Sequence, residues 1–371
     1  MIPINDLTRD LDDQMGIFDS IKQVVRSGKW IFGEEHDAFE HDLAKFIGTR
    51  YALGVANGTD ALEIALRAVG CGPGSKIITV ANAGGYASIA ASAIGCEVIY
   101  CDIDAIRLVM DPQALRNLLS DEISVVVVTH LYGNVAPISA IVEMCRIFNI
   151  KVVEDCAQAI GASEDGRLVG SIGDIGTFSF FPTKNLGAIG DGGAVTTDSA
   201  IYAENIRKIR QYGWDEKYRI QEPGGMNSRL DEIQAAILRV RFQKLLFNNE
   251  KRRQILVAYN SAIINSELKL ITSFSQNSAA HLAVFLFSDR NMRNEFRKFF
   301  ETKEIKTDIH YPILDCNQEG FKNAPEHTEL VISKSIIERL VTIPLFPSLS
   351  QNEVKHITNS LSEFIQRAKV E

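Results

Sequence analysis

One lysine stands apart in an apolar, glycine-rich stretch of the chain. In the segment GTFSFFPTKNLGAIGDGG (residues 176–193), Lys184 is the only basic residue. Burying an ammonium group without a partner is unfavourable, so lysines are normally exposed. Lys184 therefore either reaches water or acts chemically, for example as an amine that attacks a carbonyl carbon.

A carboxylate ends an apolar segment upstream of this lysine. Asp155 closes the run VVED, and Gln158 follows three residues later in VVEDCAQAIGA. A carboxylate at such a position is commonly a helix cap or a loop residue, and a functional role requires a cation for it to hold. About one helical turn separates Asp155 from Gln158, so both side chains can reach the same ligand.

The tetrapeptide Asn57-Gly58-Thr59-Asp60 follows the first apolar segment and opens a helical pattern. Thr59 or Asp60 can cap that helix, and Gly58 allows a ligand to approach the backbone. The free N–H groups at the start of a helix form a cradle for phosphate. A capped helix start without a ligand is the alternative reading of the same residues.

Together these three features match the requirements of one cofactor. Pyridoxal 5′-phosphate needs a lysine for the Schiff base and an acid that keeps its pyridine nitrogen protonated. It also needs backbone N–H groups for its phosphate. The order of Gly58, Asp155 and Lys184 along the chain therefore predicts a pyridoxal phosphate site, with Lys184 and Asp155 as catalytic residues.

The elements that must position these residues alternate between strands and helices. Short runs rich in β-branched residues predict strands, and helical spacing separates them, which predicts a mostly parallel sheet and an α/β fold. The predicted strands cover residues 51–56, 76–80, 97–101, 124–130 and 151–155, and two of the predicted helices cover residues 59–70 and 138–149. Ligands bind at the carboxyl ends of such strands, where Gly58 and Asp155 fall.

Beyond Gly192 the pattern changes. We expect a strand over residues 192–198, a helix over 203–213, and a long helical stretch, with a kink allowed, from near Asn227 to about Ile264. A strand over 281–288 and helices over 291–303 and 350–368 follow. We therefore expect a large domain over residues 1–240, with an N-terminal arm over about 1–25, and a smaller α+β domain over 241–371.

The composition narrows the class of protein. The 371 residues have a formal net charge of −8 and no long basic block, so we expect no nucleic acid partner. Six scattered cysteines without a CxxC pair predict reduced thiols and no metal site. The sequence shows no signal peptide and no apolar run long enough to span a bilayer, so we expect a cytoplasmic protein without membrane contacts.

Long motifs of the chain resemble one enzyme family. The stretch from VEDCAQAIGA to GDGGAVTTD, together with THLYGN, RQYGWDEKY, GGMNSRLDEIQAAIL and IHYPILDCNQ, is similar to the DegT/DnrJ/EryC1/StrS family of nucleotide-sugar aminotransferases. The resemblance extends over nearly the whole chain. It implies the type I fold of aspartate aminotransferase, pyridoxal phosphate as cofactor and a homodimer with shared active sites.

The same resemblance implies roles for individual residues. Lys184 would form the Schiff base, Asp155 would contact the pyridine nitrogen, and Gln158 would lie near the phenolic oxygen of the cofactor. Further residues are implied in the phosphate site (Gly58, Thr59, Ser179 and, from the other subunit, Asn227), in the sugar-nucleotide pocket (His310 and Tyr311), and near that pocket or the subunit interface (Tyr218 and Arg229).

Two departures from the family pattern concern the cofactor ring and the substrate. Relatives commonly have an aromatic residue that stacks on the ring where this chain has Asn82 and Ala83, and Tyr86 comes later. Tyr86 would stack on the cofactor, contact the sugar, or only pack at a helix start. Ile160 stands where many relatives have histidine, which bears on sugar preference or kinetics.

The resemblance implies transfer of an amino group, with glutamate as the expected donor and glutamine as an alternative. The acceptor would be a keto sugar linked to dTDP or UDP, and the motifs favour the 3-keto over the 4-keto type. The product would serve lipopolysaccharide, capsule or antibiotic-sugar synthesis. A nucleotide-sugar oxidoreductase is a remote alternative, because GVANGTDAL lacks the G-x-G-x-x-G fingerprint. A dehydratase-type relative would have histidine in place of Lys184.

Overall fold

The computed structural model describes residues 1–9, 14–264, 266–321 and 329–368. Its α-helices are α1 (Gln14–Ser27), α2 (Glu34–Ile47), α3 (Gly58–Ala68), α4 (Tyr86–Ala93), α5 (Pro112–Arg116), α6 (Ile138–Ile147), α7 (Ala200–Ile209), α8 (Glu232–Phe242), α9 (Leu245–Ala262), α10 (Arg290–Thr302), α11 (Val331–Ile336) and α12 (Gln351–Ala368). Its strands are β1 (Tyr51–Val55), β2 (Lys76–Val80), β3 (Glu97–Cys101), β4 (Ile123–Thr129), β5 (Lys151–Asp155), β6 (Ser163–Glu164), β7 (Arg167–Leu168), β8 (Ile175–Ser179), β9 (Gly193–Thr197), β10 (Trp214–Glu216), β11 (Arg219–Ile220), β12 (Lys269–Leu270), β13 (Ala283–Leu286) and β14 (Leu340–Ile343).

A seven-stranded sheet forms the larger part of the molecule, with the strand order β1-β9-β8-β5-β4-β2-β3. The pairs from β3 to β8 are parallel, whereas β9 runs antiparallel to both β1 and β8. The five strands and the mostly parallel α/β sheet expected from the sequence are confirmed.

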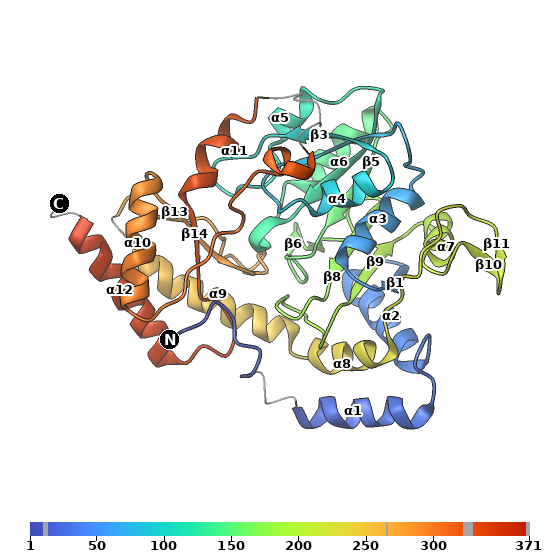
Figure 1. Ribbon diagram of the computed structural model, residues 1–371, viewed down its shortest axis with the longest axis horizontal. Coiled ribbons are helices and arrows are strands. Elements are labelled where there is room, and N and C mark those ends of the chain that lie inside the picture. Colours follow the sequence, from blue (N-terminus) through green and yellow to red (C-terminus); the bar gives the residue numbers. More distant parts are fainter. Residues whose placement is uncertain (10–13, 265, 322–328, 369–371) are drawn as a thin grey trace.

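Helices cover both faces of this sheet (Figure 1). Residues of α3, α4 and α7 form one buried apolar cluster with the sheet, and residues of α5 and α6 contribute to the cluster on the other face. Because both faces are covered, the central strands are apolar at nearly every position, as in the run ISVVVVT of β4.

The C-terminal part contains a three-stranded sheet, β12-β13-β14, with α10 and α12 beside it. The start of the chain lies against this part (Figure 1). Ile2 forms a β-bridge with Ile305, and its N–H donates to the carbonyl of Glu304 over 2.7 Å. Ile2 is therefore held beside the segment from Glu304 to Lys306.

The sequence predicted a long helical stretch from near Asn227 to about Ile264, and the predicted start is wrong. Asn227 forms a β-bridge with Gln211, and the helical region begins at Glu232 and breaks between α8 and α9 at Gln243–Lys244. A tertiary backbone pairing replaces the helix that local propensity favours.

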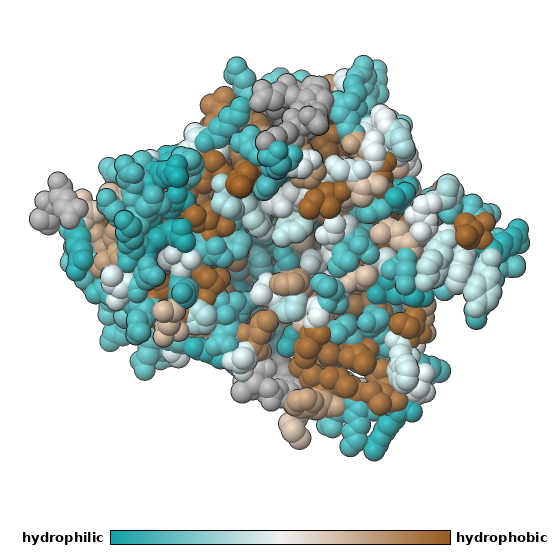
Figure 2. Space-filling view, viewed as in Figure 1, coloured by the Kyte–Doolittle hydropathy of each residue, from teal (hydrophilic) through white to brown (hydrophobic). Residues whose placement is uncertain are grey.

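Before this region, the hairpin β10–β11 projects away from the central sheet (Figure 1). The N-terminal helix α1 packs against α8, below the central sheet in the view of Figure 1. The outer side of α1 exposes Met15 (77%), Phe18 (62%) and Val25 (55%). Figure 2 shows brown, apolar atoms gathered over α1 and α8.

Candidate active site

A cavity of about 600 Å³ lies at the carboxyl ends of the central strands. Nine residues predicted from the sequence line it: Gly58, Thr59, Tyr86, Asp155, Gln158, Ser179, Lys184, His310 and Tyr311. They come from segments far apart in the sequence, and the parallel sheet brings them to one edge. Their roles in binding or chemistry stay predictions.

Lys184 lies in the loop that connects β8 to β9. Its backbone N–H donates to the carbonyl of Phe181 (2.8 Å), and the N–H of Ala188 donates to the carbonyl of Phe180 (2.7 Å). These two bonds hold the loop against the residues that directly follow β8. Burial lowers the pKa of the Lys184 side chain, and the nearby Asp155 carboxylate opposes that shift. A lowered pKa increases the fraction of neutral amine, the form that acts as nucleophile and base.

Asp155 is the last residue of β5 and is buried. Its Oδ1 accepts from the N–H of Ala157 (3.1 Å), and its Oδ2 accepts from Oγ1 of Thr129 (3.3 Å). Burial raises the pKa of Asp155, and the hydrogen bond from Ala157 and the charge of Lys184 oppose this. A cation placed in the cavity would favour the ionised form of this carboxyl group.

Gln158 joins two parts of the cavity wall. Its Oε1 accepts from the N–H of Tyr132 (2.7 Å), and its Nε2 donates to the hydroxyl oxygen of Tyr311 (3.0 Å). The hydroxyl group of Tyr132 in turn donates to the carbonyl of His310. Gln158 is thus fixed at both ends of its amide group, and the segment His310–Tyr311 is attached to the sheet.

The start of α3 meets the end of β8 closely. A Cβ atom on Gly58 would lie 2.6 Å from Cβ of Ser179, so only glycine fits there. Oδ1 of Asn57 accepts from the N–H of Asp60 (2.8 Å) and caps the helix, a role that the sequence assigned to Thr59 or Asp60. Among the described residues, the N–H groups of Gly58 and Thr59 have no acceptor and remain available to a ligand.

Tyr86 is the first residue of α4 and contributes to the cavity wall. Its ring centroid lies 6.3 Å from that of Tyr311 in an edge-to-face arrangement. Gly84, with a φ of +83°, makes room for the ring of Tyr311, because a Cβ there would lie 2.9 Å from it. The structure places Tyr86 beside Tyr311 in the cavity wall. Whether Tyr86 stacks on the cofactor or contacts the sugar stays a prediction.

Three predicted residues do not line this cavity. Tyr218 is 77% exposed at the tip of the hairpin β10–β11, Asn227 is exposed, and Arg229 lies over the ring of Tyr212 at 5.6 Å. All three belong to the projecting region between α7 and α8. Within one chain, the structure separates them from Lys184.

Sequence reasoning missed the pair formed by Glu154 and His130. Nδ1 of His130 accepts from the N–H of Ala136 (3.1 Å), so its proton is on Nε2, which donates to Oε2 of Glu154 (3.1 Å). Glu154 also accepts from the N–H groups of Gly170 (2.9 Å), Ile172 (2.7 Å) and Gly173 (2.7 Å). Burial opposes ionisation, but these bonds prevail and lower the pKa of Glu154.

This arrangement explains why two acidic residues end one apolar strand. Adjacent residues of a strand point to opposite faces, so Glu154 and Asp155 cannot share a role. The sulfur of Cys156 also lies near His130 and Glu154, but the hydrogen bonds already occupy the ligand atoms of the latter two. The alternation of the strand was the signal that could have identified Glu154 as structural.

Sequence reasoning also missed parts of the cavity wall, among them His281, Asp308, Thr183 and Asn5. His281 begins a segment that the sequence predicts only as a strand, and the observed β13 starts at Ala283. No local pattern distinguishes these residues from other polar residues at the ends of elements.

The donor set suits pyridoxal phosphate. The cavity combines a lysine with lowered pKa, a buried carboxyl group, and the free N–H groups of Gly58 and Thr59 beside the hydroxyl of Ser179. A helix N-terminus with unpaired N–H groups favours a phosphate, and a carboxylate favours a protonated ring nitrogen. The cofactor predicted from the sequence therefore fits the residues present.

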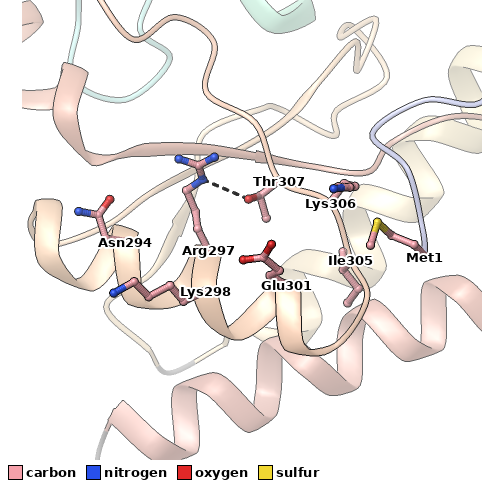
Figure 3. A pocket seen from close by; sticks show the side chains of 8 residues that line it. All are labelled: Met1, Asn294, Arg297, Lys298, Glu301, Ile305, Lys306 and Thr307. Atoms are coloured by element: carbon pink, nitrogen blue, oxygen red, sulfur yellow. Dashed lines mark hydrogen bonds between the residues drawn. The ribbon is translucent and has the colours of Figure 1, made fainter.

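A second cavity, of about 390 Å³, lies between α10 and the N-terminal end of the described chain. Figure 3 shows the side chains that line it, which are Met1, Asn294, Arg297, Lys298, Glu301, Ile305, Lys306 and Thr307. None of the residues predicted to act in the site is among them. The cavity beside Lys184 is therefore the candidate active site.

Among the helices that the structure describes, none combines the length and apolar character that crossing a bilayer requires.

Comparison with known proteins agrees with the site. Residues 12–362 match the model of the DegT/DnrJ/EryC1/StrS aminotransferase family. The chain is 36% identical over 366 residues to a dTDP-3-amino-3,6-dideoxy-alpha-D-galactopyranose transaminase of Aneurinibacillus thermoaerophilus, with 98% of this chain and 99% of that protein covered. It is 33% identical over 343 residues to a UDP-N-acetyl-3-dehydro-alpha-D-glucosamine 3-aminotransferase of Acidithiobacillus ferrooxidans, which covers 92% of this chain and 91% of that protein.

The crystal structure of DesV from S. venezuelae superposes with a TM-score of 0.94 at 31% identity, and the alignment covers 99% of both chains. The family match extends over nearly the whole chain, and the fold agrees with the sheet and cavity described above. The chain therefore belongs to the DegT/DnrJ/EryC1/StrS aminotransferase family and is a pyridoxal phosphate-dependent aminotransferase of the type I fold.

Proposed function

We propose that the protein transfers the amino group of glutamate to the 3-keto carbon of a nucleotide-linked 6-deoxyhexose. The observation that supports this most strongly is the meeting of Lys184, Asp155 and the Gly58–Ser179 cradle in one cavity. Two of the relatives named above act on 3-amino or 3-keto sugars linked to dTDP or UDP, which favours C-3 over C-4 as the site of amination.

Pyridoxal phosphate, when bound, supplies an electron sink for the carbon that loses a proton. We propose that Asp155 keeps the ring nitrogen protonated and that Lys184 holds the cofactor covalently. As a free amine, Lys184 then moves the proton to and from the reacting carbon. Its lowered pKa supports that role, because a base works best when its pKa lies near the operating pH.

The remaining residues bind and orient. Gly58, Thr59 and Ser179 would hold the phosphate at the N-terminus of α3, and Gln158 would lie beside the phenolic oxygen. Tyr86, His310 and Tyr311 would contact the sugar nucleotide, with Tyr86 also able to stack on the cofactor ring. The hydrogen bond between Gln158 and Tyr311 links these two groups of residues.

We also propose that two copies of the chain complete each other's cavities. Tyr218, Asn227 and Arg229 lie outside the cavity of their own chain, on a segment that projects from the body of the molecule. The apolar outer side of α1, with Met15, Phe18 and Val25, offers surface that a symmetric partner would cover. Asn227 would then reach the partner's phosphate site.

The substrate is tested with purified protein and a panel of dTDP- and UDP-linked 3-keto and 4-keto sugars. Each is incubated with glutamate or glutamine, and the products are analysed by mass spectrometry. We expect an amino sugar from a 3-keto substrate with glutamate. Faster turnover of a 4-keto sugar would overturn the C-3 assignment, and faster turnover with glutamine would overturn the donor.

A further inference from the structure

The first residues of the chain form part of the wall of the active-site cavity. Ile4 and Asn5 both line the cavity that contains Lys184. Asn5 and Lys184 also line a neighbouring cavity of about 140 Å³, so both residues lie at the boundary between the two cavities. The proposed function described above gives no role to this segment.

Backbone pairing fixes the segment before Ile4. The side chain of Ile2 is buried in the apolar cluster of the C-terminal part. Its N–H donates to the carbonyl of Glu304 (2.7 Å), and its carbonyl accepts from the N–H of Lys306 (2.9 Å). Two main-chain hydrogen bonds and a buried side chain therefore anchor the chain two residues before the cavity wall.

An ion-pair network fixes the segment after Asn5. Nη1 of Arg9 donates to both carboxylate oxygens of Glu353 (2.8 Å each), and its Nε donates to Oδ2 of Asp6 (2.8 Å). Glu353 is itself held, because its Oε2 accepts from the N–H (2.9 Å) and the hydroxyl (2.8 Å) of Ser350 at the start of α12. Ion pairs near a surface contribute little to stability, but this network determines where the segment runs.

The chemistry of the cavity wall indicates what Asn5 can bind. Within the described part of the chain, the side chain of Asn5 forms no hydrogen bond. An amide group donates and accepts at once, as a hydroxyl group does. Among the described residues that line the cavity, the carboxylates are Asp155, Asp191 and Asp308, and Lys184 is the only lysine or arginine. This charge balance disfavours a further anionic group, so a sugar hydroxyl suits Asn5 better than a carboxylate of the amino donor.

We propose that the segment Ile2–Arg9 is a wall of the substrate site, in which Asn5 binds a ring hydroxyl group of the keto sugar. Arg9 is then a positioning residue, because its bonds to Glu353 hold the segment that carries Asn5. This inference rests on the proposed function and deepens it, since Asn5 selects among keto sugars by a hydroxyl group that does not react.

The first test is the variant Asn5→Ala, assayed with a nucleotide-linked 3-keto-6-deoxyhexose and glutamate. We expect the KM of the sugar to rise about fivefold, the effect of one neutral hydrogen bond, with kcat and the KM of glutamate within about twofold of wild type. Asn294→Ala, in the second cavity (Figure 3), is the matched control and should leave all three constants unchanged. An unchanged KM of the sugar in Asn5→Ala would overturn the proposal.

Sugar analogues that each lack one ring hydroxyl group separate a direct contact from a general effect on the fold. For the analogue without the hydroxyl that Asn5 binds, the wild type should show the raised KM, and Asn5→Ala should raise it no further. For the other analogues, Asn5→Ala should still raise KM about fivefold. An equal rise for every analogue would mean that Asn5 contacts none of these hydroxyl groups, which contradicts the proposal.

The positioning role of Arg9 is tested by non-additivity. Arg9→Ala should raise the KM of the sugar about threefold with a Tm close to that of wild type, and it should add nothing in the Asn5→Ala background. Arg290→Ala, which breaks an exposed pair with Glu338, is the control and should leave KM unchanged. Additive losses in the double variant would show that Arg9 does not act through Asn5.

The failure of this inference differs from the failure of the proposed function. If the wild type aminates the 3-keto sugar and Asn5→Ala has the same KM, only the role of Asn5 is wrong. If the wild type aminates a 4-keto sugar instead, the assignment to C-3 fails, and the same comparison made with that sugar and its deoxy analogues still decides whether Asn5 binds a hydroxyl group.

Discussion

Gly58, at the start of α3, lies so close to Ser179, at the end of β8, that a Cβ atom on the glycine would be 2.6 Å from Cβ of the serine. Ser179 is also paired with Gly193, where a Cβ would lie 2.4 Å from the carbonyl oxygen of Asn57. Strands β8 and β9 and the start of α3 therefore lie so close together that no Cβ atom fits at Gly58 or Gly193.

This contact predicts that Gly58→Ala weakens cofactor binding. The added methyl group must displace Ser179 or the start of α3, and overpacking of this kind corresponds to a roughly tenfold or larger increase in the Kd of pyridoxal phosphate. Gly72→Ala is the matched control, because nothing lies within 4 Å of a Cβ at Gly72. Equal Kd values for the two variants, measured by fluorescence titration, would contradict the assignment of the cradle.

Lys184→Ala should bind the cofactor without a covalent bond and lose turnover by roughly a thousandfold or more, because the amine that moves the proton is absent. Amino-sugar formation and borohydride trapping measure the two effects. Lys355→Ala, at an exposed position of α12, serves as control and should behave as wild type. Turnover near the wild-type rate in Lys184→Ala would mean that another residue performs the proton transfer.

Asp155→Asn should lower kcat by roughly a hundredfold and change KM by less than about threefold, because the negative charge matters chiefly in the transition state. The asparagine keeps an acceptor for Ala157, so the local geometry is retained. Steady-state kinetics with both substrates separates the two constants. A change in kcat below about threefold would return Asp155 to a structural role.

Glu154→Gln should destabilise the fold by roughly 3 kcal/mol, because the buried carboxylate satisfies three backbone N–H groups and His130. The fold lowers the pKa of Glu154, so the protonated form is favoured more in the unfolded state than in the native state. The contribution of the Glu154 carboxylate to the free energy of unfolding is therefore complete above its pKa in the unfolded state, ~4.3, and is lost as the pH falls below that value.

Urea unfolding of both proteins checks this prediction. The difference between their midpoints should be largest at neutral pH and should narrow as the pH falls below about 4.3. Glu122→Gln, which alters an exposed carboxylate paired with Lys76, should leave the midpoint nearly unchanged. If the difference between the two urea midpoints grew as the pH fell, the fold would raise the pKa of Glu154 instead of lowering it, and the prediction would be wrong.

Complementation tests the shared active sites. We mix inactive Lys184→Ala chains with inactive Asn227→Arg chains under conditions of subunit exchange. If Asn227 acts on the partner's cofactor, each mixed dimer has one site with both changes and one site with neither, so about a quarter of the wild-type activity should return. Mixed dimers without any activity would place Asn227 outside the partner's site.

Much of the fold and of the cofactor site could be predicted from the sequence. The strands are β-branched runs separated by helical spacing, and this local pattern also places Gly58 and Asp155 at strand ends. Lys184 was distinguished by its chemistry, because an isolated lysine in an apolar glycine-rich loop needs an explanation. The long motifs then indicated the family, which the comparisons confirm.

The tertiary structure decided what depends on contacts between distant segments. Asn227 pairs with Gln211 and so lies outside the helix that its neighbours favour. The side chain of Asn185 bonds to the ring of His281 and to the carbonyl of Ala279, both far away in the sequence, and these hydrogen bonds exist only after the segment before β13 has packed beside the loop of Lys184. Local sequence patterns record propensity and periodicity, whereas the partner of a buried polar group is determined by packing, and packing requires the whole fold.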